Sequence, residues 1–228
     1  MKLSDRLQCI ANLVENCETL ADIGTDHAYL PIYLIDNRIC KKVIASDVRN
    51  GPAKKAQKNI NKLGFEDTIE VRIGDGLEVI KYNEAETIII AGMGGIMIAR
   101  ILENGKDIAK TSRDFILQPM TQHFELRNWL KNNNYDIVDE DLCKEEGRIY
   151  LILKVNYKEK NQDDINAYFG EILFNKKHPL LAAYIQKYLR ELEDVRMELS
   201  NINSAKTYEK LKEIEQRIQS FNKFLNQL

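Results

Sequence analysis

Apolar and polar residues follow two different periods along the chain, and the change falls near Asn156. Before that point, short continuous apolar runs alternate with segments in which apolar residues recur every three or four positions. The runs are typical of strands that are buried on both faces, and the spaced segments are typical of amphipathic helices. This alternation predicts a mostly parallel sheet with helices on both of its faces.

Five apolar runs are predicted strands, and a glycine or a polar residue ends or follows each of them. They span residues 20–23, 42–47, 68–73, 87–91 and 114–118. Predicted helices lie before and between them, over 3–14, 29–34, 51–63, 95–103 and 121–132. Ser4 is the expected N-cap of the first helix, and Gly64 is expected to end the third. The chain between 91 and 95 is expected to form a turn.

The end of the sheet region is predicted to be an antiparallel hairpin. Residues 135–142 and 148–155 alternate like strands, and Glu145-Glu146-Gly147 lies between them. We therefore expect an antiparallel strand near one edge of a Rossmann-like α/β sheet.

Helical spacing alone governs the rest of the chain. Apolar residues step by three and four from Leu181 to Ile202 and again from Leu211 to Leu228. This pattern predicts two long helices that pair as an antiparallel coiled-coil hairpin. We expect two domains, at residues 1–157 and 158–228.

Composition and charge narrow the class of protein without identifying the function. The formal net charge of -2 gives no global basic field, although a local patch can still bind nucleic acid. The four cysteines are scattered, so we expect reduced thiols in a cytoplasmic protein, without a disulfide framework or a metal site. We expect no signal peptide, because charges interrupt the first apolar pattern. No apolar run approaches the ~18 residues of a membrane span.

The ends of the predicted strands carry most of the candidate chemistry. Open α/β sheets bind ligands at the carboxyl ends of parallel strands, so these residues are expected to form one site. They are Gly24 to His27, Asp47, Asp75 and Gly76, Gly92 to Gly95, and Gln118 with Pro119.

Two cofactors suit such an edge. A dinucleotide site needs G-x-G-x-x-G, but Asp26 stands at the second glycine position and would repel a pyrophosphate. S-adenosylmethionine carries a sulfonium, an ammonium and a ribose diol, all of which attract carboxylates. Asp22 or Asp26 near the methionine end, Asp47 at the ribose and Asp75 near the adenine suit this ligand. An NAD(P)-dependent oxidoreductase remains the alternative.

Several motifs, in this order and spacing, resemble a known family. They are ADIGTDHAYLP, IASDV, GDGL, AGMGG, LQP and EEGRIYLI. Over residues 1 to 155 the chain resembles the bacterial tRNA adenine-22 N1-methyltransferases, and the helical hairpin fits that family's second domain. The resemblance implies a class I methyltransferase fold, S-adenosylmethionine as methyl donor, and transfer to N1 of an adenine in the D arm of tRNA.

The resemblance also implies roles for individual residues. The implied cofactor contacts are Asp22, Gly24, Thr25, His27, Asp47, Asp75, Gly76, Gly92 and Met93. Met93 covers the adenine ring or fills the core. The first loop departs from the wider methyltransferase class at Asp26. Asp26 is the candidate catalytic residue, and in this role we expect it to stabilise the cationic product. The alternative role is that Asp26 caps the helix that follows the loop.

The fourth strand end bears on the acceptor atom. Enzymes that methylate the exocyclic N6 of adenine usually place Asn or Asp, two prolines and an aromatic residue there, and this chain has Gly92-Met93-Gly94-Gly95. Ring N1 has an in-plane lone pair, so it needs placement rather than a base. N1 lies on the Watson–Crick edge, so the adenine must be unpaired or flipped out. Gly94 is predicted to help position this base.

Further residues are candidate tRNA contacts. They are Tyr29 and Gln118 at the sheet edge, and Lys176, Lys177, Lys187 and Arg190 in the helical hairpin. Core packing is the alternative for Tyr29, and a solvated face is the alternative for the cations. We expect a monomer, because the two helices can cover each other's apolar seams. A non-catalytic tRNA-binding module and a methyltransferase with another acceptor also remain open.

Overall fold

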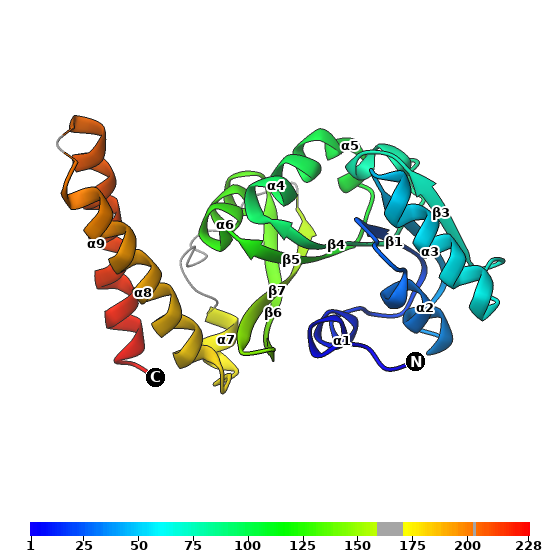
Figure 1. Ribbon diagram of the computed structural model, residues 1–228, viewed down its shortest axis with the longest axis horizontal. Coiled ribbons are helices and arrows are strands. Elements are labelled where there is room, and N and C mark those ends of the chain that lie inside the picture. The colour runs from blue at the N-terminus through cyan, green and yellow to red at the C-terminus, as the bar shows by residue number, and fades with distance from the viewer. Residues whose placement is uncertain (159–170, 203) are drawn as a thin grey trace. The chain divides into compact units, whose positions relative to one another are not determined.

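A seven-stranded sheet forms the centre of the first of two units into which the chain divides. The structure is a computed structural model that describes residues 1–158, 171–202 and 204–228. The first unit spans Met1–Ala167 and the second spans Tyr168–Leu228 (Figure 1).

The first unit contains both strands and helices. Its strands are β1 (Cys17–Ile23), β2 (Cys40–Asp47), β3 (Ile69–Ile73), β4 (Thr87–Gly94), β5 (Asp114–Thr121), β6 (Tyr135–Glu145) and β7 (Arg148–Tyr157). Its helices are α1 (Asp5–Asn12), α2 (Tyr29–Asp36), α3 (Asn50–Leu63), α4 (Gly95–Asn104), α5 (Lys106–Ala109), α6 (His123–Asn132) and the 3-10 helix η1 (Gly76–Val79). All predicted strands are confirmed, whereas α5 and η1 were not predicted.

The sheet has the strand order β3-β2-β1-β4-β5-β7-β6. Strands β1 to β5 pair in parallel, and β7 pairs antiparallel with both β5 and β6. This confirms a mostly parallel sheet with an antiparallel strand near one edge. The chain moves outward from β1 to β3 and then returns to β4 on the other side of β1. The carboxyl ends of β1 and β4 therefore flank a topological switch point, where such sheets bind ligands.

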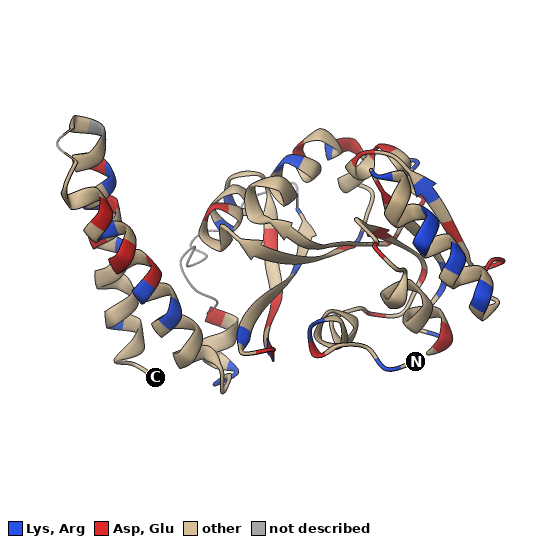
Figure 2. Cartoon of the chain, in the orientation of Figure 1, with Lys and Arg blue, Asp and Glu red and all other residues tan. Residues whose placement is uncertain are grey.

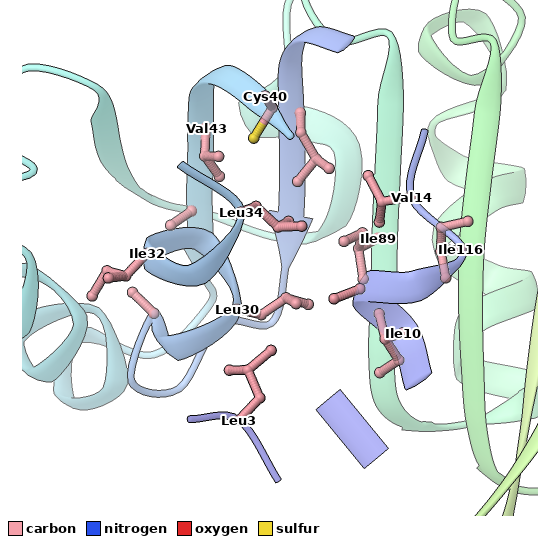
Figure 3. Packing of buried hydrophobic residues seen from close by; sticks show 14 of the residues in the cluster. Leu3, Ile10, Val14, Leu30, Ile32, Leu34, Cys40, Val43, Ile89 and Ile116 are labelled. Carbon is pink, nitrogen blue, oxygen red and sulfur yellow. The ribbon is translucent and has the colours of Figure 1, made fainter. Parts of the chain in front are cut away.

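Helices cover both faces of this sheet because its central strands are apolar on both sides. On one face, α1, α2 and α3 pack on a cluster that includes Ile10, Leu34, Val43 and Ile89 (Figure 3). Ile88 and Ile90, the neighbours of Ile89 in β4, are fully buried and point to the opposite face. Helices α4 and α6 lie on that second face, and α4 packs against β4 and β5 (Figure 1).

The structure corrects two predicted boundaries at the carboxyl edge of the sheet. Strand β4 does not turn at Gly92 but continues to Gly94, because Met93 and Gly94 still pair, with shifted register, with Pro119 and Thr121. Strand β5 runs to Thr121, which the apolar period assigned to the next helix. The ends of β4 and β5 therefore form one irregular ribbon beside the switch point.

The second unit consists of α7 (Glu171–Asn175), α8 (Leu181–Ser200) and α9 (Ala205–Leu225). Helices α8 and α9 lie side by side in opposite directions (Figure 1), and the ring centroids of Tyr188 and Phe221 are 5.8 Å apart. Ser204 caps α9, since its Oγ accepts a hydrogen bond from the backbone N of Thr207 at 3.1 Å. The helical hairpin is confirmed, and its supercoiling as a coiled coil stays a prediction. The predicted boundary at 157/158 lies at the end of β7.

Among the helices of the described ranges, none has the length and apolarity that are needed to cross a membrane. Within the same residues, no group of three or more His, Cys, Asp or Glu side chains is arranged to hold a metal ion. All cysteines carry free thiols.

Candidate active site

The loop after β1 is built around Gly24. Its φ is +84°, and an added Cβ would lie 2.3 Å from Cε of Met93. The backbone conformation and the closeness of Met93 therefore both require glycine. The N–H groups of Gly24 and Thr25 donate to the carbonyl oxygen of Ser46 at 2.8 and 2.7 Å. These two bonds join the end of β1 to the end of β2.

Two adjoining cavities open at this edge of the sheet. The first has a volume of about 360 Å³ and is lined by α1, the β1–α2 loop and the ends of β2 and β4. The second has a volume of about 350 Å³ and is lined by the ends of β1 to β4 and by α4. Both are lined by Gly24, Asp47, Arg49, Ala91 and Gly92, so they form one groove across the switch point.

Every predicted cofactor residue lines this groove. The first cavity contains Asp22, Gly24, Thr25, His27, Asp47 and Gly92, and the second contains Asp47, Asp75, Gly76, Gly92 and Met93. The structure thus brings together residues from four separate strand ends. Their roles toward a cofactor stay predictions at this point.

Asp22 is a buried carboxylate on the wall of the first cavity. Its exposed fraction is 7%, and none of the described residues forms an ion pair with it. Burial raises the pKa of the Asp22 carboxyl to about 6, although hydrogen bonding with the Thr25 side chain acts in the opposite direction. A cationic group in the first cavity would favour the ionised form of this carboxyl.

Asp47 and Asp75 supply two further carboxylates to the second cavity. Asp47 is buried, and its Oδ1 accepts a hydrogen bond from the backbone N of Arg49 at 2.8 Å. Asp75 is exposed and precedes η1, but its side chain makes no capping hydrogen bond to that helix. The Asp75 carboxylate is therefore available to a ligand.

Asp26 does not cap the following helix, which corrects that interpretation. The N-cap of α2 is Ala28, with a φ of 57°, and the helix begins at Tyr29. The Asp26 carboxylate is 61% exposed and lies 3.2 Å from Nε2 of His27. The His27 ring stacks on Tyr29, with 5.3 Å between centroids. Tyr29 is 46% exposed, so it does not pack in the core, and the three residues form a polar and aromatic rim.

Gln118 is not placed to contact tRNA, contrary to its prediction. Its side chain is fully buried, and Oε1 accepts hydrogen bonds from Nη1 of Arg6 at 2.8 Å and from the backbone N of Gly92 at 3.1 Å. Its Nε2 donates to the carbonyl of Pro119 at 2.8 Å. Gln118 therefore holds the irregular end of β4. Gly94 lies two residues beyond Gly92, outside the lining of both cavities.

Sequence reasoning missed Arg6, which α1 brings to the first cavity. The Arg6 guanidinium lies 5.8 Å from the ring centre of Tyr150, and its backbone N donates to Oε2 of Glu145 at 2.7 Å. No local signal marks Arg6, because its partner Gln118 is 112 positions away. Arg49 and Met97 also line the groove and were missed.

The predicted tRNA contacts of the second unit lie on its surface. Lys176, Lys177 and Arg190 are exposed, and Lys187 is half-buried with its Nζ 3.7 Å from Oε1 of Glu191. Their role in binding tRNA stays a prediction.

Comparison with known proteins gives consistent matches along the chain. The family model for tRNA (adenine(22)-N(1))-methyltransferase matches residues 20–223. The tRNA (adenine(22)-N(1))-methyltransferase of Bacillus subtilis is 38% identical over 229 residues, which cover 96% of this chain and 95% of that protein.

Solved structures agree with this match. Mycoplasma capricolum TrmK in complex with S-adenosyl-homocysteine has a TM-score of 0.83 and 31% identity, and the match covers 99% of both chains. Streptococcus pneumoniae Sp1610, in complex with S-adenosyl-L-methionine, has a TM-score of 0.85 and 33% identity, with 98% of this chain and 100% of that chain covered.

Proposed function

The chain belongs to the tRNA (adenine(22)-N(1))-methyltransferase family, and we propose on this premise how its own residues carry out the reaction. The activity is the transfer of a methyl group from S-adenosylmethionine to N1 of adenine 22 in the D arm of tRNA, which gives 1-methyladenine. One observation about the groove carries the proposal. Carboxylates stand at or just after the ends of three neighbouring strands, and one of them, Asp22, is buried with no cationic partner among the described residues. Such a groove suits a cationic cofactor and opposes a pyrophosphate, which disfavours the dinucleotide alternative.

The first cavity takes the methionine part of the cofactor. Asp22 binds the ammonium group, whose positive charge favours the ionised carboxylate that burial disfavours. Arg6 receives the carboxylate, because its guanidinium lines the same cavity and is otherwise held by the uncharged Gln118. A cation and an anion from separate elements thus match the two charges of an amino acid.

The second cavity takes the adenosine part. Asp47 accepts hydrogen bonds from the ribose hydroxyls, and Asp75 accepts one from the adenine amino group. Met93 and Met97 line this cavity and cover the ring. When bound, S-adenosylmethionine supplies an electrophilic methyl group next to the switch point.

Placement and charge stabilisation are the tasks left to the protein, because adenine N1 is already nucleophilic. Asp26 lies exposed on the rim and faces the positive charge that develops on the methylated base. His27 lies against Asp26 and stacks on Tyr29, so it orients the rim rather than removing a proton. Tyr29 offers an exposed ring for stacking on a base.

Phosphate contacts come from both units. Helices α8 and α9 display both signs of charge (Figure 2), and Lys176, Lys177, Lys187 and Arg190 supply cations in the second unit. Helix α3 contains no Asp or Glu, and its exposed lysines have no carboxylate partner among the described residues. These lysines are Lys54, Lys55, Lys58 and Lys62. We infer further that the protein acts in the cytoplasm and that it is a monomer. Light scattering with and without tRNA tests the oligomeric state.

Two tRNA transcripts test the acceptor site. One carries adenine at position 22 and the other carries uracil there. We expect methyl transfer from labelled S-adenosylmethionine to the first transcript only, and calorimetric binding of S-adenosylmethionine but not of NAD. Equal methylation of both transcripts would contradict the site, and absence of cofactor binding would leave a non-catalytic module.

Salt dependence tests the phosphate contacts. Replacing Lys54, Lys55, Lys58 and Lys62 with Gln should lower the slope of log affinity against log salt by about 0.7–1 for each phosphate that is no longer neutralised. A second variant replaces Lys176, Lys177 and Arg190, and a control replaces the exposed Lys106, Lys131 and Lys144. An unchanged slope in either test variant removes that surface from the tRNA site.

A further inference from the structure

Gln122, which links β5 to α6, has a backbone conformation that a non-glycine residue rarely adopts. Its φ is 59°, in the left-handed region. It occupies the N-cap position of α6, where a side chain commonly accepts a hydrogen bond from the helix. The Gln122 side chain makes no such bond. Neither the turn nor the helix therefore accounts for glutamine at this position.

The Gln122 amide lies against Gly94 instead. A Cβ on Gly94 would be 3.0 Å from Oε1 of Gln122 and 3.3 Å from Oγ1 of Thr121. Gln122 is exposed, and within the described part of the chain no residue hydrogen bonds to its side chain. The lack of a side chain at Gly94 leaves room for this amide.

The position of Gly94 links this amide to the cofactor groove. Gly92, two residues earlier in β4, lines both cavities, and Gly94 pairs with Thr121 through the shifted register. Met120, which precedes Thr121 in β5, is 39% exposed and offers an apolar surface. A polar group with free donors and an acceptor thus lies at the strand end that borders the methyl donor's groove.

We propose that Gln122 is a specificity residue that binds the Hoogsteen edge of the target adenine. Its Oε1 accepts a hydrogen bond from the N6 amino group, and its Nε2 donates to N7. Glutamine makes this bidentate pair with adenine in nucleic-acid recognition. The inference rests on the proposed function, because it assumes that adenine is the acceptor.

This pairing explains why N1 reacts and N6 does not. A grip on N6 and N7 leaves the N1 lone pair without a partner, whereas a grip on the Watson–Crick edge would occupy it. The N1 lone pair forms the new bond to the methyl carbon, and the electron pair of the broken carbon–sulfur bond stays on sulfur. No proton moves in this step, and the positive charge passes from the sulfonium to the base. The amide thereby selects adenine without the Asn/Asp-Pro-Pro-aromatic arrangement of N6 methyltransferases.

A double-mutant cycle between protein and tRNA tests the contact. Gln122→Gly removes the amide and relieves the strained φ, so this variant should fold at least as well as the wild type. Each protein is assayed with transcripts that carry adenosine or 7-deazaadenosine at position 22, in which a C–H group replaces N7. We expect Gln122→Gly to lower kcat/KM on adenosine about 10-fold or more.

The exchange of N7 should then separate the two proteins. We expect 7-deazaadenosine to lower kcat/KM about 5-fold more for the wild type than for Gln122→Gly. Because the exchange also changes the basicity of N1, the result is the ratio of the two losses. Equal losses in both proteins would overturn the contact with N7.

Two further measurements separate this role from a structural one. Gln122→Glu keeps the acceptor for N6 and loses the donor for N7, so it should behave like the 7-deaza exchange. Gln122→Gly should keep the cofactor affinity and hold or raise the thermal midpoint while activity falls. A lowered midpoint with a parallel loss of cofactor binding would indicate a structural role and overturn the proposal. If the wild type does not methylate the adenosine transcript at all, the proposed function fails instead.

Discussion

The cofactor side and the acceptor side of the groove differ in the charge of the side chains that line them. On the cofactor side, carboxylates stand at or just after the ends of β1, β2 and β3, in regular parallel pairing. On the acceptor side, β4 and β5 end out of register, and uncharged amides, Gln118 and Gln122, lie beside Gly92 and Gly94.

The difference follows from the charges of the two substrates. S-adenosylmethionine is cationic at its sulfonium and ammonium whenever it is bound, so fixed carboxylates stabilise it throughout. Adenine is neutral until the methyl group arrives, so a buried carboxylate against it would cost desolvation, and Asp26, which faces the developing charge, is exposed on the rim. Amides can instead identify the base without a charge. Variants should therefore affect either cofactor affinity or acceptor use, but not both.

The largest effect is expected at Asp22. Asp22→Asn removes the buried charge opposite the ammonium, and loss of one partner of a buried charge pair costs about 2–5 kcal/mol. We expect the Kd for S-adenosylmethionine, measured by calorimetry, to rise by at least about 30-fold. The KM for tRNA at saturating cofactor should stay close to the wild-type value. Wild-type cofactor affinity in the variant would show that the ammonium lies elsewhere.

The pH dependence of cofactor affinity tests the same role of Asp22 without a mutation. Only the ionised carboxyl attracts the ammonium, and its pKa is about 6 in the free protein. Cofactor affinity should therefore fall about 10-fold per pH unit below that value, and Asp22→Asn should lack this dependence. A calorimetric titration between pH 5 and 8 measures it.

Ionisation of Asp22 lowers the stability of the free protein, whereas it raises the affinity for the cofactor. Its pKa is raised on folding, so the native state binds more protons than the unfolded state between pH 4 and 6, and stability falls as the pH rises through that range. The loss is about 3 kcal/mol. Denaturant titrations of the wild type should show this fall, and Asp22→Asn should remove it. A pH-independent difference between the two proteins would contradict the raised pKa.

The next effect is expected at Gly24. Gly24→Ala forces a non-glycine residue to a φ of +84° and places its Cβ 2.3 Å from Cε of Met93. We expect a loss of about 1–3 kcal/mol of stability and a parallel loss of cofactor binding. Gly51→Ala is the matched control, because an added Cβ meets nothing within 4 Å there and the residue lies in the first turn of α3. Equal unfolding midpoints for the two variants would refute the close approach of Met93.

The same contrast explains which residues the sequence predicts. Asp22, Asp47 and Asp75 are predictable because the position of one residue relative to its own strand end decides its place in a parallel sheet. The glycine turn after β1 is local in the same sense. The mostly parallel sheet and both helical layers also follow from apolar runs that alternate with amphipathic segments.

The acceptor side depends on contacts that no local pattern encodes. Gln118 ends an apolar run and was predicted to contact tRNA, but the shifted register of β4 and β5 buries it. Nothing in the sequence around Arg6 distinguishes it from other residues of α1. Its hydrogen-bond partners, Gln118 and Glu145, are 112 and 139 positions away. Asp26 was predicted as a possible cap of the helix after the loop, but that helix, α2, begins at Tyr29 with Ala28 as its N-cap. Long-range contacts decided the places of Gln118 and Arg6, and the start of α2 decided that of Asp26.

The smallest effect, and the sharpest test of the separation, is expected at Gly94. Its φ of -66° suits any residue, and an added Cβ would approach only side-chain atoms, Oε1 of Gln122 at 3.0 Å and Oγ1 of Thr121 at 3.3 Å. Because the Gln122 amide can move by a few tenths of an ångström, Gly94→Ala should fold normally and bind S-adenosylmethionine with wild-type affinity. Displacement of that amide should lower kcat/KM for tRNA about 5-fold.

The origin of that loss can be traced to Gln122 itself. In a Gln122→Gly background the alanine at 94 has no amide to displace, so the two substitutions should be non-additive. Full additivity would mean that Gly94 acts on the base directly, as the sequence alone suggested. A drop in cofactor affinity comparable to that of Gly24→Ala would mean that the irregular ends of β4 and β5 also shape the cofactor cavity. The division between a charged cofactor side and an uncharged acceptor side would then fail at its boundary, between Gly92 and Gly94.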